Sequence, residues 1–276
     1  MESETTDCVG LVGAGEPVDT LRHRFETAGL RVAMAGASDD KDASIVAMAV
    51  RCGGVVVTTF GTEAPLRAAF ADRDAATARN DLVVLDVSPI APATQRDLAS
   101  SVRPSSVTLV GGRVLMRFRD GAPTPTLYID DDATRVVPLR RVLASFGDDL
   151  VITGATGRAK ALGLIDDLLA GVNAAVVNEA MALGRSAGLD APTLVSLLQK
   201  GSGATSVMAH ATVAPRDTAA SSAALARVVS AAQQADHSVL FGSVAIGVLL
   251  RQSHLAVGLD AAPVNCDVRR DRQVAA

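Results

Sequence analysis

The first half of the sequence alternates short apolar segments with segments of helical periodicity, and this alternation constrains the fold more than any other feature. The apolar segments are rich in β-branched and aliphatic residues and occur at 8–12, 31–35, 54–59 and 82–86. They are nearly continuous in apolar character, which is typical of strands in a parallel sheet covered by helices on both faces. The sequence therefore predicts an α/β fold in which helices join consecutive strands.

The pattern changes near residue 157. Two further strands are expected at 106–118 and 126–130, and a short strand at 150–152 is the last one. Beyond this point apolar residues recur at helical spacing, and we predict helices at 160–184, 192–199, 219–235 and 238–255. We therefore predict a Rossmann-type parallel-sheet domain over residues 1–157 and an all-helical domain over residues 158–276.

The charge and the aromatic content argue against two classes of partner. The 26 basic and 30 acidic residues give a net charge of −4, and aromatic residues make up 3% of the chain, with no Trp. Nucleic-acid-binding proteins usually carry a basic surface or aromatic stacking platforms, so we expect no nucleic-acid partner. No run of about twenty apolar residues lacks a charge, so we also expect no membrane-spanning helix.

The cysteine and histidine residues indicate neither a metal site nor a redox dithiol. Cys8, Cys52 and Cys266 are widely spaced without a C-x-x-C pair, and no His has a partner four residues away. A sparse, odd number of cysteines fits a reducing compartment, and the acidic start lacks the basic region of a secretory signal. We therefore predict a cytoplasmic protein without a bound metal.

A glycine-containing turn follows the first predicted strand. Gly13-Ala14-Gly15 stands between that strand and a helix that Gly29 is expected to end. In dinucleotide-binding turns of this kind the first Gly permits a tight bend, and the second lets the backbone approach a pyrophosphate at the helix N-terminus. The turn therefore predicts an NAD(P) site, with an ordinary strand–helix turn as the alternative.

The residues that follow this turn depart from the dinucleotide pattern. Val18 occupies the place of the third Gly, and Pro17 has no N–H to offer a phosphate. Glu16 carries a negative charge, which has to point away from a pyrophosphate. We still assign Glu16 and Pro17 to the predicted cofactor site, because they open the helix on which the pyrophosphate would lie.

The end of the second strand favours NADP over NAD. An acidic residue at this place usually binds the ribose 2′-hydroxyl of NAD, but no carboxylate follows the strand 31–35 directly. Ser38 is a candidate partner of the 2′-phosphate of NADP, and NAD stays open as the cofactor. Thr59 and Phe60 end another strand on the same edge, where they would contact the adenosine or simply cap the strand.

Six short motifs follow one another in an order and at spacings that match one known family. They are Gly13-Ala14-Gly15, Asp86–Pro92, Gly111-Gly112, Gly154–Gly157, Glu179–Leu183 and Gly258–Asp260. With these motifs the chain resembles, from about Val9 to Ala262, the β-hydroxyacid dehydrogenase superfamily. That family includes 3-hydroxyisobutyrate and 6-phosphogluconate dehydrogenases and the imine reductases.

The resemblance implies a reaction and an assembly. The Rossmann domain would bind NAD(P), and the helical domain would complete the site from a second subunit or from its own long helix, which implies a homodimer. A hydride would pass between the nicotinamide and a hydroxy acid, or to an imine. Ser88 would lie near the nicotinamide, and Gly111 and Gly112 would belong to the loop that binds the small-molecule substrate.

The catalytic residues of that family are missing. Alignment on Glu179 places the family's catalytic Lys at Gly163 and its two Asn residues at Asp166 and Asp167. Lys160 lies on the same helical face as Gly163 and would replace the Lys, unless it is an exposed residue of the first turn. Asp166 or Asp167 would instead stabilise a protonated imine, with a solvated helix surface as the alternative.

Two functions are left to be distinguished. The leading prediction is an NAD(P)H-dependent oxidoreductase that transfers a hydride to a C=O or C=N group of a small metabolite, with Lys160, Asp166 and Asp167 as its catalytic candidates. The alternative is a catalytically altered relative with a binding or scaffold role or with non-hydride chemistry, because Gly163 stands where the catalytic Lys is expected. Retention of the turn at Gly13 and of Ser88 favours the first function.

Overall fold

The chain divides into two compact units. The computed structural model describes residues 7–13, 16–35, 52, 54–71, 82–102, 107–119, 122–131, 136–201 and 218–257. The first unit contains the described residues up to Ala170 together with Arg227–Val239, and the second contains those from Gly171 to Ala226 and from Leu240 onward. The division falls inside helix α7 (Arg158–Ser186), whereas the domain boundary predicted at residue 157 lies at the beginning of that helix.

The first unit contains a seven-stranded sheet with the order β2-β1-β3-β4-β5-β6-β7. Its strands are β1 (Cys8–Gly13), β2 (Arg31–Ala35), β3 (Val55–Thr59), β4 (Leu82–Asp86), β5 (Val107–Arg119), β6 (Ala122–Asp130) and β7 (Leu150–Gly154). The first five strands pair in parallel. The predicted α/β class with a Rossmann-type sheet is thereby confirmed.

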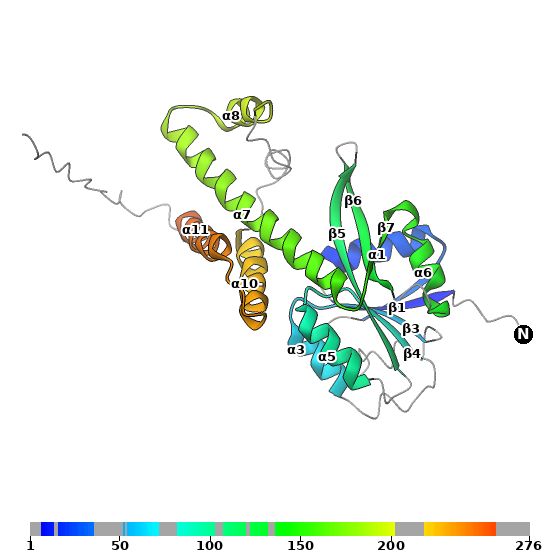
Figure 1. Ribbon diagram of the computed structural model, residues 1–276. Helices are drawn as coiled ribbons and strands as arrows, with labels where there is room; N and C mark the ends of the chain where they lie inside the picture. The colour runs from blue at the N-terminus through cyan, green and yellow to red at the C-terminus, as the bar shows by residue number, and fades with distance from the viewer. Residues whose placement is uncertain are drawn as a thin grey trace, which may run out of the picture. The chain divides into compact units, whose positions relative to one another are not determined.

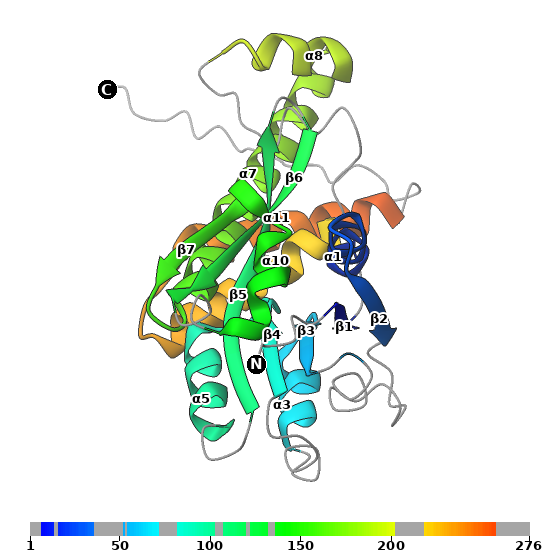
Figure 2. The ribbon, with the colours of Figure 1, turned by 90° about the vertical axis from the view of Figure 1, so that its right-hand side faces the viewer.

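The hairpin of β5 and β6 departs from the parallel pattern. β6 runs antiparallel to β5, and β7 is parallel to β6, so the sheet is mostly rather than wholly parallel. Only residues 120 and 121 separate β5 from β6, and a connection this short cannot make the crossover that a parallel pair needs. Figures 1 and 2 show this hairpin extending past the neighbouring strands.

Separate groups of helices cover the two faces of the sheet. The helices of the first unit include α1 (Glu16–Thr27), α3 (Glu63–Ala71), α5 (Pro92–Val102) and α6 (Arg140–Ala144), with short 3₁₀ turns η3 (Val137–Leu139) and η4 (Gly147–Asp149). Successive strand residues point to opposite faces: Val55 and Val57 pack in the core under α1 and α6, and Val56 packs in the core under α3 and α5. Figure 1 shows α3 and α5 side by side on one face.

The long helices follow the predicted periodicity closely. Among the described residues, the other helices are α8 (Ala191–Leu198), α10 (Thr218–Gln234) and α11 (Leu240–Val257). Small residues allow close packing in the second unit, because a Cβ on Gly171 would lie 2.5 Å from Cγ of Leu225, and one on Gly184 would collide with Leu194. The abundance of Ala and Gly in this half of the chain thus has a packing reason.

Helix α7 is long and apolar enough to cross a membrane by length and composition, although we expected no such helix from the sequence. The core helix of a globular protein passes the same test. Near its N-terminus α7 carries Lys160 and Asp167, which pair with Asp86 and Arg113 of the first unit. This part of the helix therefore packs against the sheet.

Two cysteines form a disulfide that the sequence did not predict. Cys8 opens β1 and Cys52 precedes β3, and the pairing of these two strands brings their Cα atoms to 4.8 Å. The two residues are 44 positions apart, and spacing along the chain does not reveal which strands are neighbours. Cys266 lies outside the described residues.

Candidate active site at the carboxyl edge of the sheet

The carboxyl ends of four parallel strands bring several predicted site residues to one edge of the sheet. Gly13 at the end of β1 pairs with Thr59 at the end of β3, and Asp86 at the end of β4 pairs with Gly111 of β5. Among the described strands, β2 lies on one side of β1 and β3 on the other, so this edge contains a topological switch point. Ligands of open α/β sheets bind at such a point.

Gly13 is required by the sheet itself. A Cβ at this position would collide with the carbonyl oxygen of Thr59 in the neighbouring strand. Val18, which stands in place of the third Gly of the dinucleotide pattern, is buried in the core that α1 shares with the sheet. Ala14, Gly15 and Ser38 lie outside the described residues, and their predicted cofactor contacts remain predictions.

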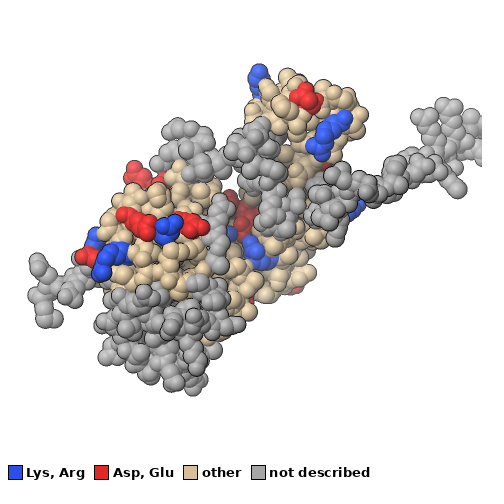
Figure 3. Space-filling model, turned by 180° about the vertical axis from the view of Figure 1, so that it is seen from behind, with Lys and Arg blue, Asp and Glu red and all other residues tan. Residues whose placement is uncertain are grey.

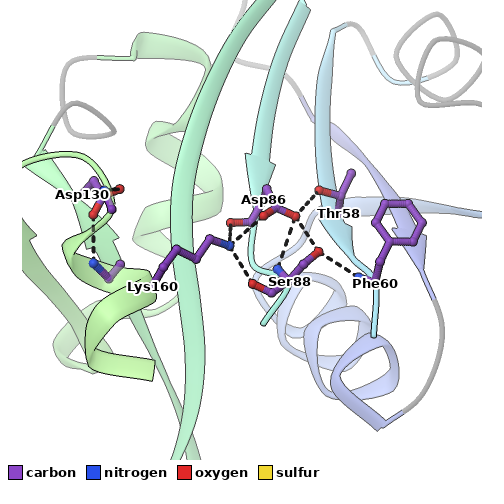
Figure 4. A network of polar contacts seen from close by, with 8 residues as sticks. Thr58, Phe60, Asp86, Ser88, Asp130 and Lys160 are labelled. Atoms are coloured by element: carbon purple, nitrogen blue, oxygen red, sulfur yellow. Dashed lines mark hydrogen bonds and ion pairs between the residues drawn. The ribbon is translucent and has the colours of Figure 1, made fainter. Parts of the chain in front are cut away.

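A fully buried ion pair lies at the same edge (Figure 4). The ammonium group of Lys160 donates to Oδ2 of Asp86 at 2.7 Å, to the carbonyl oxygen of Asp86 at 2.9 Å and to that of Ser88 at 2.8 Å. Oδ1 of Asp86 accepts from the hydroxyl groups of Thr58 at 2.9 Å and of Ser88 at 2.6 Å. The protein itself therefore supplies partners for both charged groups.

This geometry contradicts both predicted interpretations of Lys160, as an exposed residue and as a free catalytic cation. Its side chain is inaccessible to solvent. Burial lowers the pKa of the ammonium group, and the adjacent Asp86 opposes this effect. All three donor positions of Nζ point at protein oxygens, which leaves none for a substrate. The pair instead joins the start of α7 to the end of β4 and holds the loop at Ser88.

Ser88 and Phe60 also contribute to the fold at this edge. The hydroxyl group of Ser88 accepts a hydrogen bond from the backbone N–H of Phe60 at 2.9 Å and donates to Asp86. The ring of Phe60 packs in the core under α3 and α5, so it is not available for the predicted contact with adenosine. The predicted position of Ser88 near a nicotinamide remains a prediction.

Asp130, which the sequence analysis did not single out, fixes the beginning of α7. Its carboxylate accepts from the backbone N–H groups of Gly157 at 2.8 Å and Ala159 at 2.9 Å (Figure 4), which caps the helix N-terminus. A Cβ on Gly111 would lie 2.6 Å from Oδ2 of Asp130, and one on Gly112 would lie 3.2 Å from neighbouring protein atoms. Packing thus explains both glycines, and their predicted contact with a substrate would use the backbone.

A second ion pair involves α7 two turns further along the helix. Nη2 of Arg113, on β5, lies 3.1 Å from both carboxylate oxygens of Asp167. Nη2 of Arg227, on α10, lies 4.0 Å from Oδ2 of the same carboxylate. The side chains of Arg113 and Asp167 are 13% and 15% exposed. The adjacent Asp166 is exposed, and Asp167 is the candidate carboxylate that pairs with Arg113 and approaches Arg227.

The absence of a side chain at Gly163 makes room for Arg113. A Cβ on Gly163 would lie 2.6 Å from both Cγ and Nε of Arg113. The arginine side chain therefore occupies the space beside the helix position at which we expected a catalytic Lys. Sequence analysis missed Arg113 and Arg227 because both come from elements far from α7 along the chain, and no local pattern marks them.

Comparison with curated proteins gives one partial match. No protein-family model matches the chain. The 2-(hydroxymethyl)glutarate dehydrogenase of Eubacterium barkeri is 30% identical over 123 residues, which are 44% of this chain and 40% of the relative. The match therefore spans less than half of that relative's length.

Solved structures match over most of the chain. The 3-hydroxyisobutyrate dehydrogenase of Salmonella typhimurium superposes with a TM-score of 0.72 at 20% identity, covering 90% of this chain and 94% of that one. Psf3, in complex with NADP⁺ and 2-OPP, gives 0.71 at 18% identity over 89% and 94%. An imine reductase variant from Myxococcus stipitatus, in complex with NAD⁺, gives 0.56 at 13% identity over 90% and 94%. The chain thus has the fold of these dehydrogenases and reductases.

Proposed function

We propose that the protein is an NAD(P)-dependent oxidoreductase that transfers a hydride to a C=O or C=N group of a small metabolite. The observation that carries the proposal is the convergence of Gly13, Thr59, Asp86 and Gly111 at the switch point of the sheet. The curated relative is a dehydrogenase, and structures with the same fold include complexes with NADP⁺ and NAD⁺. These similarities support a redox role at this edge.

The end of β1 and the beginning of α1 support a dinucleotide site at the first strand–helix turn. Helix α1 begins at Glu16, shortly after Gly13 ends β1, and the unpaired N–H groups of a helix N-terminus attract phosphate. Pro17 offers no N–H, so a pyrophosphate would depend on the other amides of the turn. A bound nicotinamide cofactor would supply the hydride. We propose NADP as the preferred cofactor because no carboxylate directly follows β2, with Ser38 as a candidate 2′-phosphate partner.

The charge of the second ion pair favours a C=O substrate over a C=N substrate. Arg113 and Arg227 contribute two positive charges and Asp167 one negative charge, so the three groups carry a net charge of +1. This cluster would repel a protonated imine and attract the negative charge that develops on a carbonyl oxygen during hydride transfer. The predicted role of Asp167 beside an iminium ion is therefore disfavoured.

A binding protein without redox activity is the second candidate function. The observation that favours it is the combination of Gly163 at the expected Lys position with a Lys160 whose donors are all used. Such a protein could retain a dinucleotide site and lack turnover. Measurement of turnover in addition to cofactor binding separates the two candidates.

We also propose a homodimer that forms through α7. Ile165, Leu169, Val176 and Leu183 are exposed, and their spacing places them along one face of the helix. An exposed apolar stripe of this kind favours burial against another copy of the chain. Size-exclusion chromatography with light scattering tests this assembly, and Leu169→Glu with Val176→Glu would shift a dimer to a monomer.

We propose a protein without a nucleic-acid or membrane partner. Its cytoplasmic location stays a proposal from the sequence, and the disulfide between Cys8 and Cys52 argues against it, because disulfides are rare in the cytoplasm. On the face shown in Figure 3, acidic and basic side chains of the described residues lie interspersed. A mixed surface of this kind does not provide the single-sign field that attracts nucleic acid. The net charge of −4 supports the same expectation.

Cofactor titration tests the proposed function most directly. NADPH and NADH are each titrated into the purified protein, with nicotinamide fluorescence and thermal shift as readouts. Micromolar binding of either form supports the oxidoreductase, and the ratio of the two affinities gives the cofactor preference. Failure of both forms to bind at millimolar concentration would overturn the redox proposal.

A further inference from the structure

We infer that Arg113 and Arg227 form a binding site for an anionic oxygen group, either a carboxylate or a phosphoryl group, that is carried by the substrate. That the anion belongs to a substrate rests on the proposed function. The anion site itself follows from the side chains of the first unit. The two arginines would determine specificity and would not donate a proton, because guanidinium groups stay protonated in proteins.

The first argument concerns hydrogen-bond donors that the protein does not use. A guanidinium group has five N–H donors in a planar fork, but within the described chain Arg113 uses only Nη2, which contacts both oxygens of Asp167. Nε of Arg227 is buried and has no hydrogen-bond partner among the described residues. A buried donor without an acceptor destabilises a protein, so an oxyanion that accepts from Nε of Arg227, and also from the remaining donors of Arg113, would be bound favourably.

The second argument concerns charge. One carboxylate, Asp167, stands against two guanidinium groups, and the pair of Arg113 with Asp167 is largely withdrawn from solvent. Burial lowers the pKa of Arg227, which means that its environment opposes the positive charge, although Asp167 partly compensates. A second negative charge would balance the cluster, and a ligand is the natural source of it.

The third argument concerns space. Gly163 leaves the volume into which Arg113 is folded, because a Cβ there would come within 2.6 Å of the arginine side chain. Arg113 stands two residues after Gly111 on β5, just past the carboxyl edge of the parallel strands. The arginine is thus held at the edge where ligands of this fold class bind.

The fourth argument separates the anion from the phosphates of a cofactor. In the order β2-β1-β3-β4-β5, strand β5 lies three positions from β1. Neighbouring strands are about 4.8 Å apart, so the backbone of β5 lies roughly 14 Å from that of β1, which leads into the turn that would bind a pyrophosphate. The 2′-phosphate of NADP would lie further away still, beside β2. An anion at Arg113 therefore belongs to the second reactant.

Calorimetric titration of two simple anions tests the inference. Oxalate represents a carboxylate and inorganic phosphate represents a phosphoryl group, and each is titrated at fixed ionic strength with NADPH present and absent. We expect one of them to bind, and Arg113→Met to weaken that binding roughly 10- to 100-fold, the range for a hydrogen bond to a charged group. Preference for oxalate or for phosphate identifies the source of the oxyanion.

Two further variants make the test specific. Arg117→Met removes an exposed arginine four residues along the same strand, and we expect unchanged anion affinity. Gly163→Ala keeps both guanidinium groups and forces Arg113 out of its place, and we expect weaker binding. It also serves if Arg113→Met fails to fold, which circular dichroism would reveal.

The outcomes separate this inference from the proposed function. Binding of NADPH without binding of either anion overturns the anion site and leaves the oxidoreductase. Binding of an anion that Arg113→Met weakens, without binding of NADPH, supports the anion site and overturns the oxidoreductase. Equal losses in Arg113→Met and Arg117→Met would show a nonspecific charge effect and would also overturn the anion site.

Discussion

Two ion pairs join helix α7 to the sheet, and the protein uses their polar atoms to different extents. Lys160 and Asp167 are seven residues apart and therefore lie on the same face of the helix. The pair of Lys160 with Asp86 is completely buried, and every donor of the lysine has an acceptor in the chain. The pair of Arg113 with Asp167 is slightly exposed, and the arginine keeps donors that are not used.

The chemistry of the two cations explains this difference. An ammonium group is compact and has three donors, which one carboxylate and two carbonyl oxygens satisfy completely at Lys160. A guanidinium group presents five donors in a rigid plane, and the single carboxylate of Asp167 cannot satisfy them. The first pair therefore fixes the loop after β4, and the second has capacity left for a ligand.

The largest effect is expected from breaking the fully buried pair of Lys160 with Asp86. Lys160→Met leaves the carboxylate of Asp86 buried without its cation, and we expect the free energy of unfolding to fall by about 3–5 kcal/mol. Urea denaturation measures the change. Lys200→Met, at an exposed position of the same residue type, is the control and should stay within about 0.5 kcal/mol of the wild type. A loss below about 1 kcal/mol for Lys160→Met would show that the pair does not fix the edge.

Breaking the pair of Arg113 with Asp167 should affect activity more than stability. Arg113→Met removes the proposed anion ligand, and we expect kcat/KM for an anionic carbonyl substrate to fall about 100-fold, which corresponds to about 2.7 kcal/mol. Asp167 keeps Arg227 as a neighbour, so we expect the free energy of unfolding to change by only about 1 kcal/mol. Steady-state kinetics and urea denaturation of the same preparation compare the two effects. A larger loss of stability than of activity would make this pair structural, like the first.

The free energy of unfolding should depend on pH through the titration of Lys160 in its pair with Asp86. Burial lowers the pKa of Lys160 below its ordinary value of 10.5, so between the folded-state pKa and 10.5 the unfolded chain binds more protons than the folded protein. Stability then rises with pH in this window. We expect the free energy of unfolding of the wild type, relative to that of Lys160→Met, to increase as the pH rises towards 10. A constant difference between the two proteins would contradict a lowered pKa.

The smallest effect is expected from an exposed ion pair, which sets the lower end of the comparison. Arg22 and Glu26 approach to 3.4 Å on the surface of α1, with side chains 41% and 48% exposed. Glu26→Gln should lower the free energy of unfolding by less than about 0.5 kcal/mol. Thermal unfolding in low and high salt measures it, and a change comparable to that of Lys160→Met would mean that burial does not govern these pairs.

The elements of the fold were predictable where the determining forces are local. The run at 54–59 forms a strand because β-branched side chains suit a pleated, buried backbone, and Gly29 ends α1 with a φ of 77° that favours glycine. The antiparallel β5–β6 hairpin and the disulfide between Cys8 and Cys52 were not foreseen. Both depend on which strands become neighbours, and each strand's own residues do not encode that choice.

The candidate site was predictable only in part. The sequence identified Asp167 as a polar residue of interest, and it identified the gap left by Gly163. It did not reveal that the side chain of Arg113 fills this gap. Nor did it reveal that Lys160 is buried in an ion pair with Asp86. A side chain's role depends on its partners, and the partners lie 54 and 74 residues away along the chain.

The sequence by itself predicted the class of fold and the edge at which we propose that a ligand binds, because hydrophobic periodicity and glycine placement act over short stretches of chain. Only the tertiary structure decided that the donors of Lys160 are all used within the chain and that those of Arg113 are not. Burial, hydrogen-bond satisfaction and net charge are properties of a place in space, and β4, β5, α7 and α10 must meet before that place exists.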